Sequence, residues 1–421
     1  MKKELLVDLI IVGGGACGLT AAICAARKNK NKKIIILEAE DRVGKKILVT
    51  GNGRCNLLNK NISLKNYNFD SRSFLKPLLK RYSNEKILEF FHSLGLITKF
   101  DSEGRIYPFC GQASSVLDVL RLECKRLGIA EMCGFNIENF LLNNKKFIIS
   151  SNNYEIISKK VIFSTGGATF FDNKNFINIY KILTELGHTY KGCFPSLVPI
   201  KTNMGFESQL KGVRTIAKIK LLCNKSLIKE EFGEVQFTDK GISGICIFQI
   251  SRLVSEFLSL RTVNGEKYKS LIISIDLLPN FSLDEVYKLL FNKVLTFKDE
   301  QVDTLFLGII NKKFLNPILK ISNVFYKNRK LGSFSGTEIL KIAHTIKNFE
   351  FLPTGTMPFI NAHVMSGGVN LFEIDKLPLE SLKVKNLYMT GELLNVDGDC
   401  GGYNLYWAWI SGMIAGDAIK F

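Results

Sequence analysis

The chain has 421 residues, of which 46% are hydrophobic and 23% charged; this composition excludes a disordered protein and predicts two or three domains. The net charge of +18 favours a polyanionic partner such as nucleic acid, although a coding sequence rich in A and T explains the same excess. Ten scattered cysteines without a CxxC pair exclude a disulfide framework, so we expect reduced thiols, no metal site and a cytoplasmic protein.

The first predicted unit is a strand, a glycine turn and a helix, which together read VDLIIVGGGACGLTAAICAARKN. The apolar run Val7 to Val12 is typical of a parallel strand that is buried on both faces. Gly13, Gly15 and Gly18 then give the GxGxxG spacing, which lets the backbone approach a pyrophosphate at a helix N-terminus. These glycines would break a membrane-spanning helix, so no membrane association is expected.

The next strand, KKIIILEAE, ends at Glu38, twenty residues after Gly18. A carboxylate at this place can accept hydrogen bonds from the adenosine ribose of a dinucleotide. We therefore predict a bound dinucleotide, with a glycine turn that has no ligand as the alternative. The residues expected to contact it here are Gly13, Gly15, Ala16, Cys17, Gly18, Glu38 and Ala39.

A polar loop with several glycines follows, DRVGKKILVTGNGRCNLLN, from Asp41 to Asn59. It can fold over the cofactor and place cations near the phosphates; the alternative is a basic surface loop. Its candidate contacts are Lys46, Gly53, Arg54, Cys55 and Asn56. A later strand, KKVIFSTGGA, ends in a turn that can contact the cofactor again through Thr165, Gly166 and Gly167.

The middle of the chain is expected to be an insertion. SLVPIKT, RTIAKIKLLC and EVQFT alternate like strands, and Ser282 to Ser322 has helical periodicity. A second complete GxGxxG unit is missing, so we expect no dedicated nicotinamide domain.

The C-terminal stretch is predicted to close the first domain. KNLYMTGE is the last strand, VDGDCGGYN is a loop at its carboxyl end, and NLYWAWISGMIAGDAI is the closing helix, with Trp407 and Trp409 in the core. Backbone N–H groups at the start of this helix can stabilise negative charge on a bound cofactor. The candidate contacts are Gly391, Glu392, Asp397, Gly402, Tyr403 and Asn404.

These motifs together resemble the YhiN/BaiN flavoproteins, often labelled aminoacetone-oxidase-like. The similar stretches include IVGGGACGLTAA, GKKILVTGNGRCNLLN, STGG, TGTMPF and GELLNVDGDCGGYNLYWAWISGMIAG, in order from residue 11 to residue 416. One segment departs from the family: after Gly167 the chain reads ATFFDNKN where the family continues with a glycine-containing turn. The contacts of that turn are therefore not carried over to this chain.

The resemblance implies bound FAD and an α/β fold, a two-segment Rossmann-like FAD-binding domain with an inserted β-rich domain and a small helical subdomain. The expected ranges are 1–192 and 354–421 for the FAD-binding domain, 193–278 and 331–353 for the β-rich domain, and 279–330 for the helical domain.

The resemblance also implies an FAD-dependent oxidoreductase, because family members are linked to reduction of a ribosomal RNA uridine, reduction of enone steroid acids, and amine oxidation. We expect a reductase of an activated C=C bond that uses NAD(P)H as a transient reductant. The first substrate hypothesis is uridine in 23S ribosomal RNA, which becomes dihydrouridine. The alternatives are a flavoenzyme acting on a small-molecule enone or amine, and a non-enzymatic flavin-bearing RNA-binding protein. The sequence indicates no oligomeric state.

Reduction of a C=C bond needs a proton donor beside the flavin. Four candidates follow from the motifs: Cys55, Cys400, Tyr403 and His363. For the cysteines, packing against the cofactor is the alternative role. An RNA substrate further predicts basic residues around the flavin entrance, with Lys28 to Lys33 and Lys327 to Lys330 as the densest runs, whereas a small-molecule enzyme predicts an even distribution.

Overall fold

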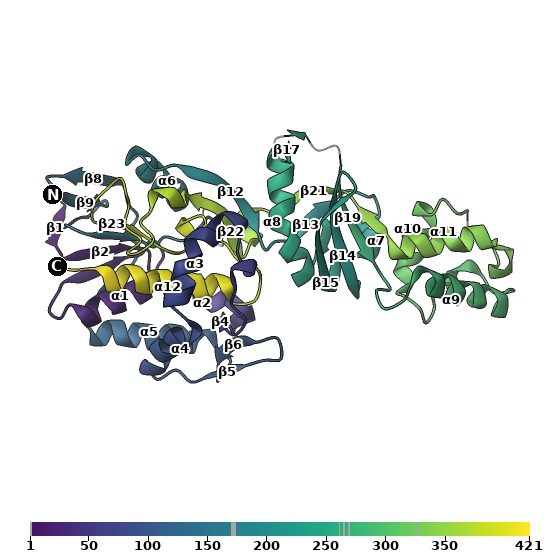
Figure 1. Ribbon diagram of the computed structural model, residues 1–421, viewed down its shortest axis with the longest axis horizontal. Helices are drawn as coiled ribbons and strands as arrows, with labels where there is room; N and C mark the ends of the chain where they lie inside the picture. Colours follow the sequence, from purple (N-terminus) through teal and green to yellow (C-terminus); the bar gives the residue numbers. More distant parts are fainter. Residues whose placement is uncertain (1, 170–173, 261, 264–265, 268–269, 326) are drawn as a thin grey trace. The chain divides into compact units, whose positions relative to one another are not determined.

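The computed structural model describes residues 2–169, 174–260, 262–263, 266–267, 270–325 and 327–421. Unit 1 consists of Met1–Phe194 and Val364–Phe421, and unit 2 of Pro195–His363 (Figure 1). The predicted α/β class with a two-segment Rossmann-like domain is confirmed. The sequence placed the return to the first domain at residue 354, but β21 (Pro353–Thr356) pairs with β13 (Ile200–Thr202) of unit 2, so the second junction follows this strand.

Unit 1 is built on a parallel sheet of five short strands. Each strand is a run of three or four mostly β-branched or other apolar residues, and β-branched side chains suit a pleated surface that is covered on both faces. Neighbouring strands pair in register, with Leu9 opposite Ile34 and Ile162 opposite Ile11. The spatial order is β23 (Leu387–Met389), β11 (Val161–Phe163), β2 (Leu9–Val12), β3 (Ile34–Leu37) and β7 (Ala130–Met132).

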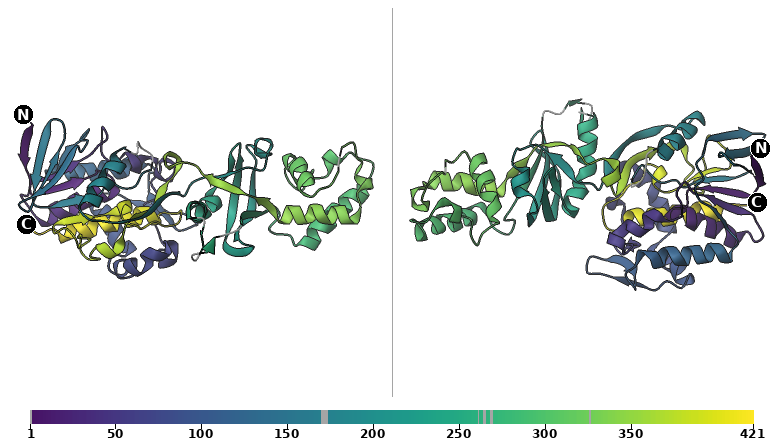
Figure 2. Two further views of the ribbon diagram at one scale, coloured as in Figure 1. Left: turned by 90° about the horizontal axis from the view of Figure 1, so that it is seen from above. Right: turned by 180° about the vertical axis from the view of Figure 1, so that it is seen from behind.

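Two helices from opposite ends of the chain pack side by side in unit 1. They are α1 (Ala16–Lys28) and α12 (Tyr403–Ala418), and they remain neighbours when the molecule is turned (Figures 1 and 2). A Cβ atom at Gly412 would lie 2.4 Å from the Cys17 carbonyl oxygen, so the small residues of the closing helix permit this approach. Trp407 and Trp409 are buried, as predicted, and their indole N–H groups donate to backbone oxygens.

Smaller elements surround this core. The helices are α2 (Lys45–Val49), α3 (Arg72–Arg81), α4 (Asn84–Ser93), α5 (Ala113–Arg126) and α6 (Lys174–Glu185). The strands are β1 (Lys3–Leu6), β10 (Tyr154–Ser158), β9 (Lys146–Ser150) and β8 (Asn139–Asn143) in one sheet, β4 (Leu58–Asn59), β6 (Arg105–Pro108) and β5 (Thr98–Phe100) in a second, and the pair β12 (Tyr190–Ser196) and β22 (Val364–Val369). In the segment that departs from the family, residues 170–173 lie outside the described residues.

Unit 2 contains an antiparallel sheet and a group of helices. Buried side chains alternate along β14, as predicted, and face α8 and the core of the unit. The strand order is β20 (Phe349–Phe351), β19 (Leu271–Asp276), β14 (Arg214–Cys223), β15 (Ser226–Thr238), β16 (Gly241–Ser243), β13 and β21; β17 (Thr262–Val263) and β18 (Glu266–Lys267) form a separate pair. The helices are α7 (Glu207–Leu210), α8 (Ile245–Leu260), α9 (Leu283–Thr296), α10 (Leu315–Ile321) and α11 (Gly336–Lys347).

Sequence-encoded caps explain where two helices of unit 2, α9 and α11, begin. Ser282 caps α9 and Ser335 caps α11, and each forms a capping box with a glutamate three residues later. The helical periodicity predicted for Ser282 to Ser322 is confirmed by α9 and α10.

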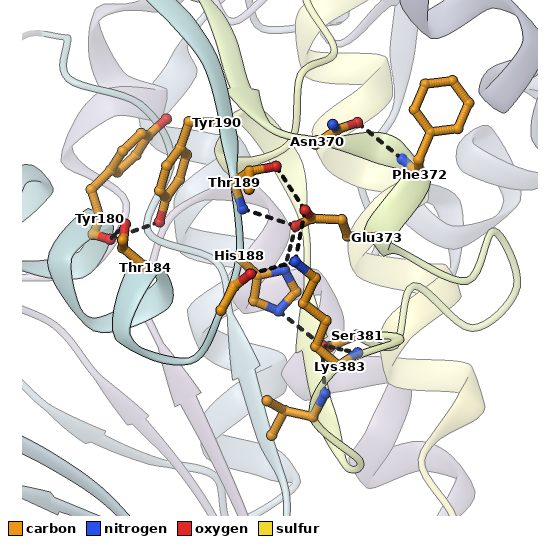
Figure 3. A network of polar contacts seen from close by, with 12 residues as sticks. Tyr180, Thr184, His188, Thr189, Tyr190, Asn370, Phe372, Glu373, Ser381 and Lys383 are labelled. Atoms are coloured by element: carbon orange, nitrogen blue, oxygen red, sulfur yellow. Dashed lines mark hydrogen bonds and ion pairs between the residues drawn. The ribbon is translucent and has the colours of Figure 1, made fainter.

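A network of hydrogen bonds joins the segment before β23 to His188 in unit 1 (Figure 3). The hydroxyl of Ser381 accepts hydrogen bonds from the backbone N–H groups of Lys383 and Val384, so its own hydrogen points to His188 Nε2, 2.8 Å away. His188 Nδ1–H then donates to Glu373 at 2.9 Å. The His188 ring is therefore neutral and fully bonded, and burial lowers its pKa.

Candidate functional site

All five strands of the unit 1 sheet run in one direction, so their carboxyl ends meet at one edge. We call this the carboxyl edge and the opposite one the amino edge. The loops that follow β2, β3, β11 and β23 all start at the carboxyl edge, and each contains residues that the sequence analysis selected. Ligands of open α/β sheets bind at such an edge.

The glycine turn after β2 has the shape that a phosphate requires. A Cβ atom at Gly18 would lie 1.9 Å from the Gly13 carbonyl oxygen, so only glycine lets α1 start this close to the strand. A Cβ atom at Gly15 would meet nothing within 4 Å, which leaves the approach to the N-terminus of α1 open. Ala16 and Cys17 form the first turn of this helix, and the Cys17 thiol contacts the Ser164 carbonyl oxygen.

Glu38 follows β3 directly and lies beside the glycine turn. One carboxylate oxygen accepts from the Gly14 N–H at 2.7 Å and the other from the Glu40 N–H at 2.9 Å. These bonds fix the carboxylate at the place predicted for ribose recognition, with Ala39 next to it in the chain. Each oxygen of the Glu38 carboxylate can accept more than one hydrogen bond, so both oxygens can still accept a bond from a ligand.

Lys46 and Glu392 form an ion pair at the carboxyl edge. The two atoms are 2.7 Å apart, although the residues are separated by almost the whole chain. Lys46 also donates to Thr169, and the Glu392 carboxylate accepts from the backbone N–H groups of Gly167 and Met365. The pair therefore joins α2 to the loops after β11 and β23. Both residues were predicted to contact the cofactor, but the sequence did not indicate that they pair.

The GNGRCN loop has an unusual backbone. Cys55 has a φ of 56° and a side chain that is completely buried, which few non-glycine residues adopt together. Burial raises the pKa of its thiol to about 12. Gly53 and Arg54 are exposed beside it, and the Arg54 guanidinium lies 4.8 Å from the centre of the Tyr107 ring.

The C-terminal loop is held from within by side chains that were expected to face the cofactor. Asn68 donates to the Asp397 carboxylate at 2.7 Å, and Ser366 donates to the same oxygen. Asn404 bonds both the N–H and the carbonyl of Gly398. Gly402 then begins α12 with a left-handed conformation. Asp397 and Asn404 were predicted to contact the cofactor, but the bonds that they form here order the loop itself.

Three buried side-chain atoms in the described part of the chain lack a hydrogen-bond partner. They are Asn56 Oδ1, Thr165 Oγ1 and Asn395 Oδ1, and all three lie in loops at the carboxyl edge. An unsatisfied buried polar atom costs about 1–3 kcal/mol, so such atoms are rarely retained without a role. Together with the open Gly15 turn, they fit a ligand with many polar atoms, and FAD has hydroxyl, amide and phosphate groups of this kind.

The four proton-donor candidates lie in different environments. Cys55 is completely buried, and Tyr403 is nearly so, with a pKa raised by burial. Cys400 is partly exposed on the loop before α12, and burial also raises the pKa of its thiol. His363 is an exposed residue of unit 2, where its ring lies 5.3 Å from that of Phe248. Cys400 is therefore the candidate of unit 1 that combines a site at the carboxyl edge with an accessible side chain.

Each predicted basic run is partly engaged in ion pairs. Lys28 pairs with Asp417 and Lys32 with Asp8 at the amino edge, so this run takes no part in the carboxyl edge. In unit 2, Arg329 pairs with Glu338 at 2.7 Å. The sequence analysis missed a different basic segment: from Arg42 to Asn84 the chain has ten lysines and arginines and one acidic residue. A count of charges over a longer window, rather than a search for dense runs, would have found it.

Among the described residues, no helix is long and apolar enough to cross a membrane, and no group of three histidine, cysteine or acidic side chains could hold a metal ion.

Known proteins resemble the chain over nearly its full length. The model of the HI0933-like protein Rossmann domain family matches residues 7–418. A 3-dehydro-bile acid delta(4,6)-reductase of Clostridium scindens is 37% identical over 97% of this chain and 98% of its own. A ribosomal RNA dihydrouridine synthase of Haemophilus influenzae is 28% identical over 96% of both chains. A quinol-fumarate reductase structure shares the fold with a TM-score of 0.50, 13% identity, and coverage of 98% of this chain and 70% of its own.

Proposed function

The chain belongs to the HI0933-like Rossmann family and is an FAD-dependent oxidoreductase, and we propose that it reduces a carbon–carbon double bond that is conjugated to a carbonyl group. The resemblance to the YhiN/BaiN flavoproteins is confirmed by this family match. The observation that carries the proposal is full-length similarity to two kinds of enzyme whose names describe one chemistry. Membership of an enzyme family also argues against a non-enzymatic flavin-bearing protein.

Both kinds of substrate present the same reacting group. A Δ4,6 bile acid with a 3-oxo group has carbon–carbon double bonds conjugated to a ketone, and the C5=C6 bond of uracil is conjugated to the C4 carbonyl. When bound, FAD supplies hydride to such a bond, and NAD(P)H is the proposed reductant. The protein must then hold the substrate carbonyl and deliver a proton to the carbon next to it.

We assign the role of proton donor to the thiol of Cys400. A general acid must reach the substrate, and Cys400 lies partly exposed on the loop before α12, whereas Cys55 is sealed inside the protein. A raised pKa keeps the Cys400 thiol protonated at neutral pH, which a proton donor requires. The backbone N–H groups at the start of α12 provide partial positive charge at the same edge.

The first substrate candidate is a uridine in ribosomal RNA. The net charge of +18 and the basic segment from Arg42 to Asn84 support a polyanionic substrate, and the Haemophilus influenzae relative is named for this reaction. The second candidate is a small-molecule enone, which is favoured by the 37% identity to the bile acid reductase.

The two candidates can be separated with one preparation. The purified protein is loaded with FAD and reduced anaerobically with NADPH, which should remove the yellow colour. A steroid enone and transcribed 23S ribosomal RNA are then added in separate reactions. The proposal expects at least one of them to restore the colour and to be recovered with its double bond reduced. Failure of both to oxidise the reduced protein would contradict the proposed reaction, and the substrate that reacts identifies the class.

A further inference from the structure

We propose that unit 1 binds a single-stranded stretch of RNA on a surface beside the carboxyl edge. The surface is formed by Arg54, Lys60, Lys65, Phe69, Arg72 and Phe100, and we call it the basic aromatic face. This inference rests on the RNA branch of the proposed function and names the surface that would hold that substrate.

The first observation is the distribution of charge. Ten cations and one acid lie between Arg42 and Asn84, and the single acid, Asp70, pairs with Lys191. Lys45 and Lys46 have carboxylate partners. Within the described ranges, no carboxylate forms an ion pair with Arg54, Lys60 or Lys65, and all three are exposed. Cations that are not neutralised by the protein itself remain available for phosphate groups.

The second observation is that the surface is attached directly to the cofactor edge. Asn59 donates to the Gly401 carbonyl oxygen at 3.1 Å, and the Tyr67 hydroxyl donates to the Tyr403 carbonyl oxygen at 2.9 Å. The Asn68 backbone N–H donates to the Asp397 carbonyl oxygen at 3.0 Å. Residues that alternate with the exposed cations therefore hold this segment against the loop that carries Cys400, so a strand bound on the surface lies next to that loop.

The third observation is the exposed aromatic rings among the cations. Phe69 is 79% exposed and Phe100 is 62% exposed, and each ring lies beside a cation of the same face. The Lys60 ammonium lies 3.3 Å from the centre of the Phe100 ring, and the Arg72 guanidinium lies 5.7 Å from that of Phe69. A base can stack on such a ring while the neighbouring cation moves to its phosphate.

The combination identifies the occupant. An apolar small molecule would use the rings but not the cations, and an acidic peptide would use the cations but not the flat ring faces. Single-stranded RNA uses both. Asp101 and Glu103, in the turn between β5 and β6, both pair with Arg105, so this turn carries one net negative charge against the several cations of the face.

Binding of a fluorescent single-stranded RNA to the FAD-loaded protein tests the proposal, with affinity measured across a range of KCl concentrations. The double variant K60Q/K65Q removes two cations from the basic aromatic face. Its matched control, K30Q/K33Q, removes two exposed cations from the amino edge of the same unit. We expect K60Q/K65Q to weaken binding about tenfold at low salt and to reduce the slope of log K against log salt by about 1.4, since each phosphate contact on a single strand contributes about 0.7. The control should leave both unchanged.

The aromatic part of the proposal has its own variant. F69A/F100A should weaken binding about tenfold without changing the salt slope, because stacking releases no counterions. Equal effects of K60Q/K65Q and K30Q/K33Q, or full affinity of F69A/F100A, would overturn the proposal. Reduction of the bound FAD by NADPH should be normal in all three variants, so a protein that binds RNA through this face but reduces no uridine would refute the proposed function and not the binding surface.

Discussion

The two edges of the five-stranded sheet in unit 1 are built in opposite ways. At the amino edge, polar groups are paired with one another: Lys32 contacts Asp8, Lys160 donates to Asn386, and the His188 network satisfies each of its members. At the carboxyl edge, three buried polar atoms have no partner within the described residues. The comparison shows that the amino edge satisfies its polar groups internally, whereas the carboxyl edge leaves buried polar atoms without a protein partner.

Charge follows the same division. Both edges carry many cations, but Lys28 and Lys32 of the amino edge pair with aspartates, whereas Lys60 and Lys65 of the basic aromatic face form no ion pairs within the described ranges. The net charge of +18 therefore says more about a partner once each cation is placed relative to the sheet and to the nearest carboxylate. Four predictions test the division, from the largest expected effect to the smallest.

The substitution Gly15→Val should separate folding from cofactor binding. A Cβ atom at Gly15 would meet no protein atom within 4 Å, so we expect the variant to fold, but its side chain obstructs the approach of a pyrophosphate to α1. The wild type should purify with non-covalent FAD, and the variant should bind FAD at least about 100-fold more weakly, as expected when hydrogen bonds to a charged phosphate are lost. Calorimetric titration of the apo proteins measures this difference, and normal FAD affinity of the variant would show that the glycine turn does not hold the cofactor.

Substitution of Cys400 should mainly lower turnover, whereas substitution of Cys55 should mainly lower stability. Cys400→Ser should leave FAD bound and lower turnover about 100-fold, the usual contribution of a general acid. Cys55→Ser places a hydroxyl in a sealed site and should lower the melting temperature more than the turnover. Steady-state kinetics and thermal unfolding distinguish these outcomes; full turnover of Cys400→Ser would exclude it as the proton donor and direct attention to Tyr403 and His363.

Glu392→Ala should destabilise the carboxyl edge. The substitution leaves Lys46 without its carboxylate and the N–H groups of Gly167 and Met365 without an acceptor. The free energy of unfolding of the apo protein should fall by about 2 kcal/mol, less than for a fully buried pair because both side chains are partly exposed. Glu392→Gln, which retains an acceptor oxygen, should lose less. Urea denaturation that shows equal stability for Glu392→Ala and the wild type would contradict the structural role of the pair.

At the amino edge we expect a smaller effect, a dependence of the protein's stability on pH. Burial lowers the pKa of His188 below its usual value of about 6.5, so the unfolded chain binds the proton more readily and stability is lost as the pH falls below that value. Burial opposes ionisation of Glu373, but hydrogen bonds from Lys383, Thr189 and His188 outweigh it and hold its pKa at about 2. Glu373 therefore contributes no change above its usual range of about 4.5.

Urea denaturation between pH 7.5 and pH 5 isolates the histidine. The free energy of unfolding should fall by up to about 1.4 kcal/mol for each pH unit below 6.5, and this part of the fall should be absent from His188→Asn. A wild-type profile with the same slope as that of His188→Asn would show that this histidine does not titrate on unfolding.

Much of the carboxyl edge is predictable from the sequence because its motifs consist of residues that are close together in the chain. The glycine spacing from Gly13 to Gly18, the strand before Glu38 and the loop before α12 each combine a strand with the turn that follows it. The burial of Trp407 and Trp409 follows from the apolar closing helix in the same way.

Other features depend on contacts between distant parts of the chain, which no local pattern contains. Lys46 meets Glu392 and Asn68 meets Asp397 only when the sheet is complete, so these pairs were not predicted. The burial of Cys55 depends on a left-handed backbone that the sequence GRCN does not specify. The basic aromatic face was missed because its cations are spaced five to seven residues apart, and the fold brings Phe100 from a later strand to Lys60.

The dihydrouridine content of large-subunit ribosomal RNA tests the central claim most directly. RNA from the parent organism, from a strain that lacks this protein, and from that strain complemented with the wild type or Gly15→Val would be digested and measured by mass spectrometry. Dihydrouridine should disappear in the absence of the protein and return with the wild type but not with Gly15→Val. An unchanged dihydrouridine content in the strain that lacks the protein would contradict the RNA assignment and leave the small-molecule enone as the substrate of this edge.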